Sequence, residues 1–443
     1  MSSRSLSKTG GTIVLVAAKV ACRFTMLLWL MLLAAVPASG QEKIPRVAVI
    51  TTVWYQNSHA DVIGGRLLEG YNLNGQGEFP KLKLVSIFTD QVPENDKSRV
   101  LAEKHKVPIF DSIAGALTLG GDQLAVDGVL MIAEHGKYPA NDTGSTAYPK
   151  RRLFGEIVST FEKTGKVVPV FSDKHLSDKW EDADWFWQTA AKHKIPLMAG
   201  SSVPQAWRVP AIDLKKDKPI KEIVVTSYGR LDSYGFHGLE ALQCLVERRA
   251  GGETGVKRVR CLAGDEVWRA MDRGEFSSQL LEQAVATFQI RPLPAGKTVR
   301  DLPKKPALFQ IEYNDGLKAS VAHLDNGLAE WGAAWKYADG GTESTLFRLQ
   351  EEHPFAHFTN LLKGVEQMMH TGKPAWSTER TLLTSGLLDV VLTSKRDGGK
   401  YLETPFLNIR YQNAWNWQEP PPMPPKTPPP NTPRPSTPKP AKK

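Results

Sequence analysis

The segment RVAVITT, residues Arg46–Thr52, is followed after a helical stretch by LKLVSIFT, residues Leu82–Thr89. Both runs are apolar and rich in β-branched residues, which is typical of strands buried on both faces of a sheet. Similar strand patterns recur at Val126–Ala133, Val167–Phe171 and Pro196–Gly200, each separated from the next by helical spacing. Strands that alternate with helices in this way predict a parallel, doubly wound sheet.

The pattern changes after about Ala206. Further strand patterns lie at Glu222–Tyr228, Val256–Ala263, Ala307–Tyr313 and Leu317–Leu324, and the last two flank the hairpin signal Asn314-Asp315-Gly316. The sequence therefore predicts an α/β fold in two domains. Residues 41–205 form a Rossmann-like domain with a doubly wound parallel sheet, and residues 206–419 form an α+β domain with an open, mostly antiparallel sheet.

The first forty residues have the composition of a signal peptide. All charges before Glu42 are positive, an apolar run covers Met26–Val36, and small residues precede Gln41. We expect cleavage before Gln41, export to the periplasm or the extracellular space, and no stable membrane insertion afterwards. The alternatives are a retained anchor that begins further back, at Thr12–Cys22, and a chain that starts at Met26.

The composition of the C-terminal tail and the distribution of net charge along the chain argue against a nucleic-acid partner. Residues 420–443 contain twelve prolines and predict a tail that is disordered or extended as polyproline II. The net charge is +9, but the signal peptide carries +4 and the tail +5, so the body is neutral and is not expected to bind nucleic acid. No Cys or His spacing predicts a metal site, and Cys244 and Cys261 are expected to be buried thiols.

Short motifs mark the predicted elements: Leu84–Asp90, Leu101–His105, Val107–Asp111, Val126–Ile132, Gly165–Lys174, Thr371–Pro374 and Glu379–Leu383. These motifs, and the order of elements over residues 45–405, resemble the Gfo/Idh/MocA family of nicotinamide-dependent sugar dehydrogenases. The resemblance implies a small-molecule carbohydrate substrate and NAD or NADP as cofactor. The resemblance is also compatible with a homo-oligomer formed through the C-terminal sheet.

The dinucleotide-binding loop is where the sequence departs from that family. Thr51, Val53 and Gln56 stand in place of the glycines of G-x-G-x-x-G, and their side chains obstruct the close approach of a pyrophosphate. If a dinucleotide binds, the resemblance places Thr51 and Thr52 beside it and Asp90 on its ribose. A chain that uses no cofactor is an equal alternative, in which Asp90 caps the next turn.

Two motifs supply acid–base candidates. Lys174, in Asp173-Lys174-His175, matches the lysine of the family's Glu-Lys-Pro, which polarises the substrate oxygen. His237 matches the family's catalytic histidine, and Asp232 lies one residue from the position of its acidic partner. A partly desolvated lysine and a near-neutral histidine can both exchange protons with a sugar hydroxyl. We expect Lys174, His237 and Asp232 to be catalytic, the alternatives being a surface lysine and a packed histidine.

The segment after the strand Val126–Ala133 has no close counterpart in that family. It carries Glu134, His135, Lys137 and Tyr138 to the carboxyl end of the sheet, where doubly wound sheets bind ligands. We expect these four residues to contact the substrate. A structural lid with ordinary polar residues is the alternative.

Three functions agree with these residues. The first is a sugar oxidoreductase in which Lys174 and His237 are the acid–base groups. The second is a cofactor-free carbohydrate-binding protein, and the third is a non-redox enzyme of hydrolase or lyase type on a degenerate Rossmann scaffold. The length of the resemblance favours the first function, whereas the missing glycines and the expected export favour the other two.

Overall fold

The computed structural model describes residues 43–325 and 327–427. The predicted signal peptide and residues 428–443 of the predicted tail lie outside this part of the chain. Within it, no helix is both long enough and apolar enough to cross a membrane.

The first sheet is parallel throughout, as the alternating strands and helices predict, with the strand order β2-β1-β3-β4-β5. Its strands are β1 (Arg46–Thr51), β2 (Lys83–Thr89), β3 (Gly128–Ile132), β4 (Val170–Asp173) and β5 (Leu197–Gly200). Every residue of β3, β4 and β5 is buried. The order reverses between β1 and β3, and doubly wound sheets bind their ligands beyond the carboxyl ends of the strands at such a point.

One strand of the Rossmann pattern is reduced to a single bridge. Ile109 pairs in parallel with Ile87 of β2, through hydrogen bonds from Ile87 N to Pro108 O and from Phe110 N to Ile87 O. Pro108 has no N–H group with which to extend the pairing. With this bridge counted as the third strand, the sheet has the Rossmann order 3-2-1-4-5-6.

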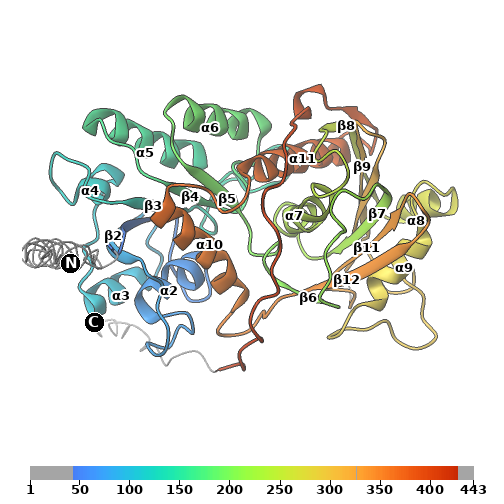
Figure 1. Cartoon of the computed structure of the whole chain (residues 1–443), viewed down its shortest axis with the longest axis horizontal. Coiled ribbons are helices and arrows are strands. Elements are labelled where there is room, and N and C mark those ends of the chain that lie inside the picture. The colour runs from blue at the N-terminus through green and yellow to red at the C-terminus, as the bar shows by residue number, and fades with distance from the viewer. Residues whose placement is uncertain (1–42, 326, 428–443) are drawn as a thin grey trace, which may run out of the picture. The chain divides into compact units, whose positions relative to one another are not determined.

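Helices cover both faces of this sheet (Figure 1). One face carries α4 (Ile113–Thr118), α5 (Lys150–Thr164) and α6 (Trp180–Lys192), and the other carries the π-helix η1 (Ala60–Gly64), α2 (Arg66–Glu69), α3 (Ser98–His105) and α10 (His357–Thr371). The helical spacing at His59–Tyr71 is thus divided between η1 and α2. The helix α10 comes from the part of the sequence assigned to the second domain, yet it packs on the first sheet because its apolar stripe meets the core of β1.

The second sheet is mixed and mostly antiparallel, with β10 and β7 as its parallel pair. In spatial order its strands are β13 (Leu402–Glu403), β8 (Val256–Ala263), β9 (Ala307–Tyr313), β10 (Lys318–His323), β7 (Ile220–Ser227), β11 (Trp331–Tyr337), β12 (Thr342–Arg348) and β6 (Trp207–Val209). The predicted hairpin is confirmed as the β9–β10 pair. The helices α7 (Tyr234–Val246) and α11 (Thr378–Arg396) share the core on one face, and α8 (Asp265–Asp272) and α9 (Ser278–Ala286) share the core on the other.

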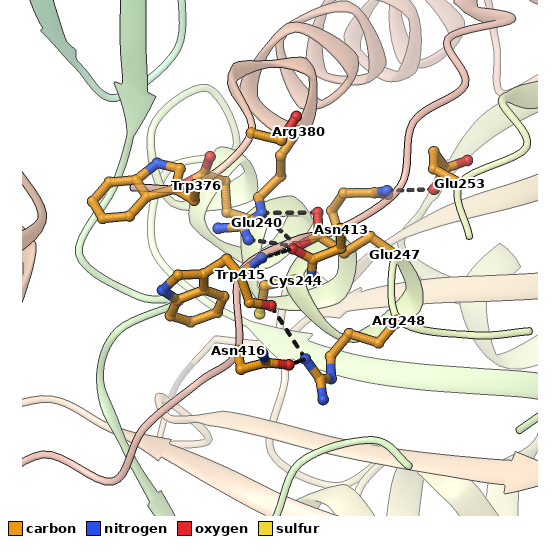
Figure 2. Close-up of polar contacts among 12 residues, drawn as sticks. Glu240, Cys244, Glu247, Arg248, Glu253, Trp376, Arg380, Asn413, Trp415 and Asn416 are labelled. Carbon is orange, nitrogen blue, oxygen red and sulfur yellow. Dashed lines mark hydrogen bonds and ion pairs between the residues drawn. The ribbon is translucent and has the colours of Figure 1, made fainter. Parts of the chain in front are cut away.

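A buried ion pair joins α7 to α11 (Figure 2). Arg380 Nε donates to both carboxylate oxygens of Glu247, at 3.0 and 3.2 Å, and both side chains are at most 1% exposed. The Tyr411 hydroxyl donates to the same carboxylate at 2.7 Å, and the Trp415 ring lies 5.1 Å from the Arg380 guanidinium carbon. The segment after the short 3-10 helix η2 (Pro405–Leu407) is therefore fastened to the second domain.

The first residues of the proline-rich tail, 420–427, are hydrogen-bonded to the rest of the chain. Trp207 Nε1 donates to Pro421 O at 2.7 Å, Gln350 Nε2 donates to Pro424 O at 2.7 Å, and Thr427 N donates to the carbonyl oxygen of His353 at 3.0 Å. A proline segment has no internal hydrogen bonds, so its carbonyl oxygens are available to these donors. Cys244 and Cys261 are buried free thiols, as predicted.

The Arg380–Glu247 pair gives the first testable expectation. Arg380→Leu leaves a buried carboxylate without its cation, so we expect the free energy of unfolding to fall by about 3–5 kcal/mol in urea denaturation. The matched control is Arg300→Leu, which removes an exposed pair with Asp272 and should change stability little. Equal losses in the two variants would contradict the structural role of the buried pair.

A second expectation concerns Glu240 of α7, which accepts hydrogen bonds from Ser201 N at 2.6 Å and Thr381 Oγ1 at 3.0 Å. Burial raises the pKa of Glu240 to about 7, whereas a glutamate in an unfolded chain titrates near about 4.3. Between these pH values the unfolded chain loses a proton that the folded chain keeps. The free energy of unfolding should therefore be highest below the pKa of glutamate in the unfolded chain. As the pH rises from there to the pKa of Glu240 in the folded chain, the free energy of unfolding should fall by about 1.4 kcal/mol per pH unit. Urea denaturation of Glu240→Gln should lack this slope, and an unchanged slope would refute the assignment.

Candidate active site

A cavity of about 450 Å³ lies at the carboxyl ends of β3 and β4, where residues of the second domain also reach it. It brings together Glu134, His135, Lys174, Asp232 and His237, which are five of the residues expected from the sequence to catalyse or bind. Aromatic and imidazole side chains also line it, among them His59, Tyr148, His175, Tyr234, Trp331 and His357. A cavity of this size and place fits a small-molecule ligand.

Glu134 is the centre of the buried charge in this cavity. Its carboxylate lies 2.7 Å from Lys150 Nζ and 3.0 Å from Lys174 Nζ. Burial alone raises the pKa of Glu134, but Lys150 and Lys174 together hold that pKa well below its usual range. Burial likewise lowers the pKa of Lys174, and Glu134 with Asp173 raises it above the usual value. Both partners are therefore charged at neutral pH.

The backbone is unusual at two of these residues. Lys174 (φ 57°) and His135 (φ 68°) adopt the left-handed conformation, which side chains with a Cβ rarely take. Each follows the end of a strand, and Lys174 N is fixed by a hydrogen bond to Gly200 O at 3.1 Å. Such strained positions gather at functional sites, where the surrounding structure holds them. Here the turn after β4 directs the Lys174 side chain to Glu134.

Four of the cavity histidines are held as neutral imidazoles. Burial, and then the positive charge of Lys174, lowers the pKa of His237 well below its ordinary value. Burial is also the main cause that lowers the pKa of His135, His175 and His357 to about 3 each. A neutral imidazole offers one hydrogen-bond donor and one acceptor. These four histidines thus make their part of the cavity wall polar without adding charge to it.

Asp232 lines the cavity but already has a cationic partner. Arg230 Nη2 donates to it at 2.6 Å, and Thr146 N lies 3.4 Å from the same carboxylate. Burial raises the pKa of Asp232, but Arg230 lowers it below the ordinary value. The structure therefore presents Asp232 to a ligand as an ionised acceptor beside a guanidinium.

Lys137 and Tyr138, which were expected to bind substrate, do not line this cavity. Lys137 N donates to Gln91 Oε1 and Gln91 Nε2 donates to Lys137 O, both at 2.9 Å. The Tyr138 hydroxyl donates to Asp90 at 2.7 Å. Both residues belong to the segment between β3 and α5, residues 133–149, which we call the lid. They fasten the lid to the end of β2. The left-handed turn at His135 and the following Gly136 (φ 105°) explain this, because they turn the chain away from the cavity directly after Glu134 and His135.

Buried polar atoms around the cavity lack partners among the described residues. They are Glu134 Oε1, which has close ion pairs but no well-aligned hydrogen bond, and His135 Nε2, His175 Nδ1, His237 Nδ1 and His357 Nδ1. An unsatisfied buried polar atom costs about 1–3 kcal/mol, so native proteins rarely leave several together. A ligand with several hydroxyl groups can satisfy such atoms.

Several residues that line the cavity, or that hold its charged groups in place, were missed by sequence reasoning. Lys150 opens α5 and donates from Nζ to the carbonyl oxygens of Asp173 at 2.8 Å and His175 at 2.7 Å. Trp331 lies far from the motifs in the sequence, and His59 lies three residues after Gln56, where the glycine pattern gives no reason to expect a site histidine. For His175 and Lys150 a signal was present, since both adjoin segments already assigned to the carboxyl edge of the sheet.

Comparison with solved structures finds the same fold in dehydrogenases. GenD2 from gentamicin A biosynthesis, in complex with NAD, superimposes with a TM-score of 0.52 at 12% identity, covering 83% of this chain and 99% of that one. An apo scyllo-inositol dehydrogenase from Lactobacillus casei gives a TM-score of 0.50 at 10% identity, covering 82% and 98%. The chain has the Gfo/Idh/MocA fold. Comparison with protein-family models and with curated proteins gives no match.

The Gfo/Idh/MocA fold implies a nicotinamide dinucleotide, but the residues after β1 do not fit one. Thr51 and Thr52 are fully buried, and their hydroxyls donate to Ile132 O and Glu134 O, both at 2.8 Å. Trp54, also fully buried, lies against Gly64, where an added Cβ would be 3.0 Å from the indole. Side chains of the protein itself thus fill the turn that must approach a pyrophosphate closely.

Side chains of the protein also fill the position at the end of β2 where a dinucleotide's ribose would bind. Asp90 accepts from the Tyr138 hydroxyl and forms an ion pair with Arg152 at 2.5 Å. Both partners belong to the lid or to α5, so Asp90 holds the lid in place. The residues at this edge of the sheet therefore do not fit a dinucleotide. Among residues 43–325 and 327–427, no group of three or more His, Cys, Asp or Glu side chains could hold a metal ion.

This arrangement gives a direct expectation for cofactor binding. Calorimetric titration of the purified chain with NAD and with NADP should show no saturable binding up to millimolar concentration, because Trp54 and the Asp90–Arg152 pair occupy the required space. A Kd below about 100 μM, equivalent to about −5.5 kcal/mol, would contradict this description of the β1 loop.

Proposed function

We propose that the cavity binds a polyhydroxylated ring compound, a sugar or sugar derivative, and carries out acid–base chemistry on it without a nicotinamide cofactor. The observation that carries this proposal is the group of buried polar atoms on four cavity histidines that lack hydrogen-bond partners among the described residues, beside the ion-paired Glu134 carboxylate. Their number and their mixture of donors and acceptors suit a ligand that bears hydroxyl groups on several sides.

Aromatic side chains on the second-domain wall support a ring-shaped ligand. Tyr234 and Trp331 stack with their rings 5.9 Å apart and 4° from parallel, and the His237 ring meets both at 81°. Flat aromatic faces of this kind give shape and apolar contact, while a few polar groups fix orientation. A sugar ring has one less polar face for such a wall and hydroxyls for the opposite wall.

Lys174 and His237 have complementary properties for proton transfer. Lys174 is an ammonium group fixed by Glu134, so it can donate to an oxygen that gains negative charge during reaction. His237 is a neutral imidazole, so it can accept a hydrogen bond or a proton from a hydroxyl. In this proposal Glu134, His135 and Asp232 bind hydroxyl groups beside them.

A redox function is the second candidate. It is favoured by the fold shared with GenD2, which was solved with NAD, and it would give Lys174 and His237 the same acid–base roles. Fold similarity at this identity is a weak guide to chemistry. The NAD titration separates the two candidates.

The proposed function predicts ligand binding that depends on Lys174. We expect isothermal titration with myo-inositol and with glucose to show that at least one of them binds, and Lys174→Met to weaken that binding by tenfold or more, about 1.4 kcal/mol. His237→Phe should also weaken it. The matched control, Lys192→Met, removes an exposed lysine of α6 and should leave the Kd unchanged. The proposal fails if neither compound binds, or if Lys174→Met and Lys192→Met behave alike.

A further inference from the structure

The loop between β1 and η1 carries a histidine to the cavity. In a dinucleotide-binding domain this segment holds the glycines of the phosphate turn, whereas here it ends in His59, which lines the cavity. His59 Nδ1 lies 2.6 Å from Oδ2 of Asp173, the last residue of β4. The Asp173 side chain is fully buried, and that of His59 is 14% exposed.

The hydrogen bond fixes which nitrogen of His59 is free to react. An ionised carboxylate only accepts hydrogen bonds, so Nδ1 carries the hydrogen and Nε2 keeps its lone pair. Contacts to His135 and Phe358, with ring centroids at 5.1 and 5.2 Å, hold the imidazole plane in place. A buried aspartate that orients a histidine in this way stabilises the imidazolium that forms when Nε2 takes a proton.

The other cavity histidines lack this arrangement. Within the described residues, none of His135, His175, His237 and His357 has a hydrogen bond to a carboxylate, although His175 Nδ1 lies 3.6 Å from Glu134. Burial disfavours their charged forms. Among the cavity histidines in the described part of the chain, His59 therefore has the carboxylate partner that orients a general base.

Charged groups surround His59 on several elements. Glu134, His135 and His237 lie near enough to His59 that a positive charge on its imidazole lowers the pKa of each of them. Lys174 follows Asp173 directly in the chain. The turn after β4 thus supplies both the carboxylate that orients His59 and an ammonium group on the cavity wall.

We infer that His59, oriented by Asp173, is the base that acts on a carbon atom of the substrate, while His237 exchanges protons with hydroxyl groups, and that the substrate is a polyhydroxylated ketone. This inference rests on the proposed function and names the substrate class for it. His59 Nε2 removes a proton from the carbon next to the carbonyl. The electron pair of that C–H bond forms the double bond of an enolate, and the carbonyl oxygen takes the negative charge beside the Lys174 ammonium. Return of the proton to the same carbon regenerates the ketone, so no oxidant or reductant is consumed.

The first part of the test measures the reactivity of the His59 imidazole and its dependence on Asp173. The full chain is treated with diethyl pyrocarbonate, which acylates uncharged, accessible imidazole nitrogens, and each histidine is followed by peptide mass spectrometry. His59 should react faster than the other four cavity histidines, and Asp173→Asn should slow it about tenfold or more. The matched control is Asp389→Asn, which changes a partly buried carboxylate that accepts from Trp180 N and should not affect His59.

The second part measures the chemistry with inosose, the ketone of myo-inositol, in D₂O. NMR should show exchange of the proton next to the carbonyl without added NAD, and His59→Gln, whose amide can still donate to Asp173, should slow exchange by about 10²–10⁴. Exchange that survives in His59→Gln overturns the base assignment.

The remaining outcomes separate this inference from the function on which it rests. Slow modification of His59, or modification insensitive to Asp173→Asn, refutes the oriented base whatever the ligand. Rapid, Asp173-dependent modification without any exchange refutes the ketone substrate. If myo-inositol and glucose also fail to bind, the proposed function itself is refuted.

Discussion

The cavity depends on one buried carboxylate, Glu134, placed between two lysines at the carboxyl end of β3. Its negative charge allows Lys150, at the start of α5, and Lys174, at the end of β4, to remain charged away from water. Two buried ammonium groups without this partner would repel each other and bear their full desolvation cost. Lys150 in turn donates to the carbonyl oxygens of Asp173 and His175 and so holds the turn on which Lys174 lies. The lid, α5 and β4 therefore meet at this carboxylate.

The same edge of the sheet shows how a dehydrogenase fold can be used without the dehydrogenase's cofactor loop. Thr51, Thr52 and Trp54 make the β1 loop part of the core, and Asp90 holds the lid through Tyr138 and Arg152. A shorter lid and glycines after β1 would open this edge. The fold thus retains the ligand position of a doubly wound sheet, while its own side chains occupy the neighbouring place for a dinucleotide.

Sequence patterns predicted the fold better than the site, for physical reasons. Buried parallel strands such as Val126–Ala133 need continuous apolar runs, so the sheet could be predicted from the pattern of apolar residues along the sequence. Lys174, His237 and Glu134 meet because strand ends and a helix start converge on one edge, which topology predicts. The directions of Lys137 and Tyr138 depend on the left-handed turn at His135, which no local pattern reveals. The pairing of His59 with Asp173 joins residues 114 positions apart, and the packing of α10 on the first sheet is equally non-local.

The most direct test of a polyol site without a dinucleotide is a crystal structure of the chain grown with both myo-inositol and NAD in excess. The expected result is density for a six-membered ring between Lys174 and Trp331, within hydrogen-bond distance of His59 and His237, and no density for NAD along the ends of β1 and β2. Ordered NAD at the β1 loop, with Trp54 displaced, or an empty cavity with the ring bound elsewhere, would contradict the assignment of this cavity.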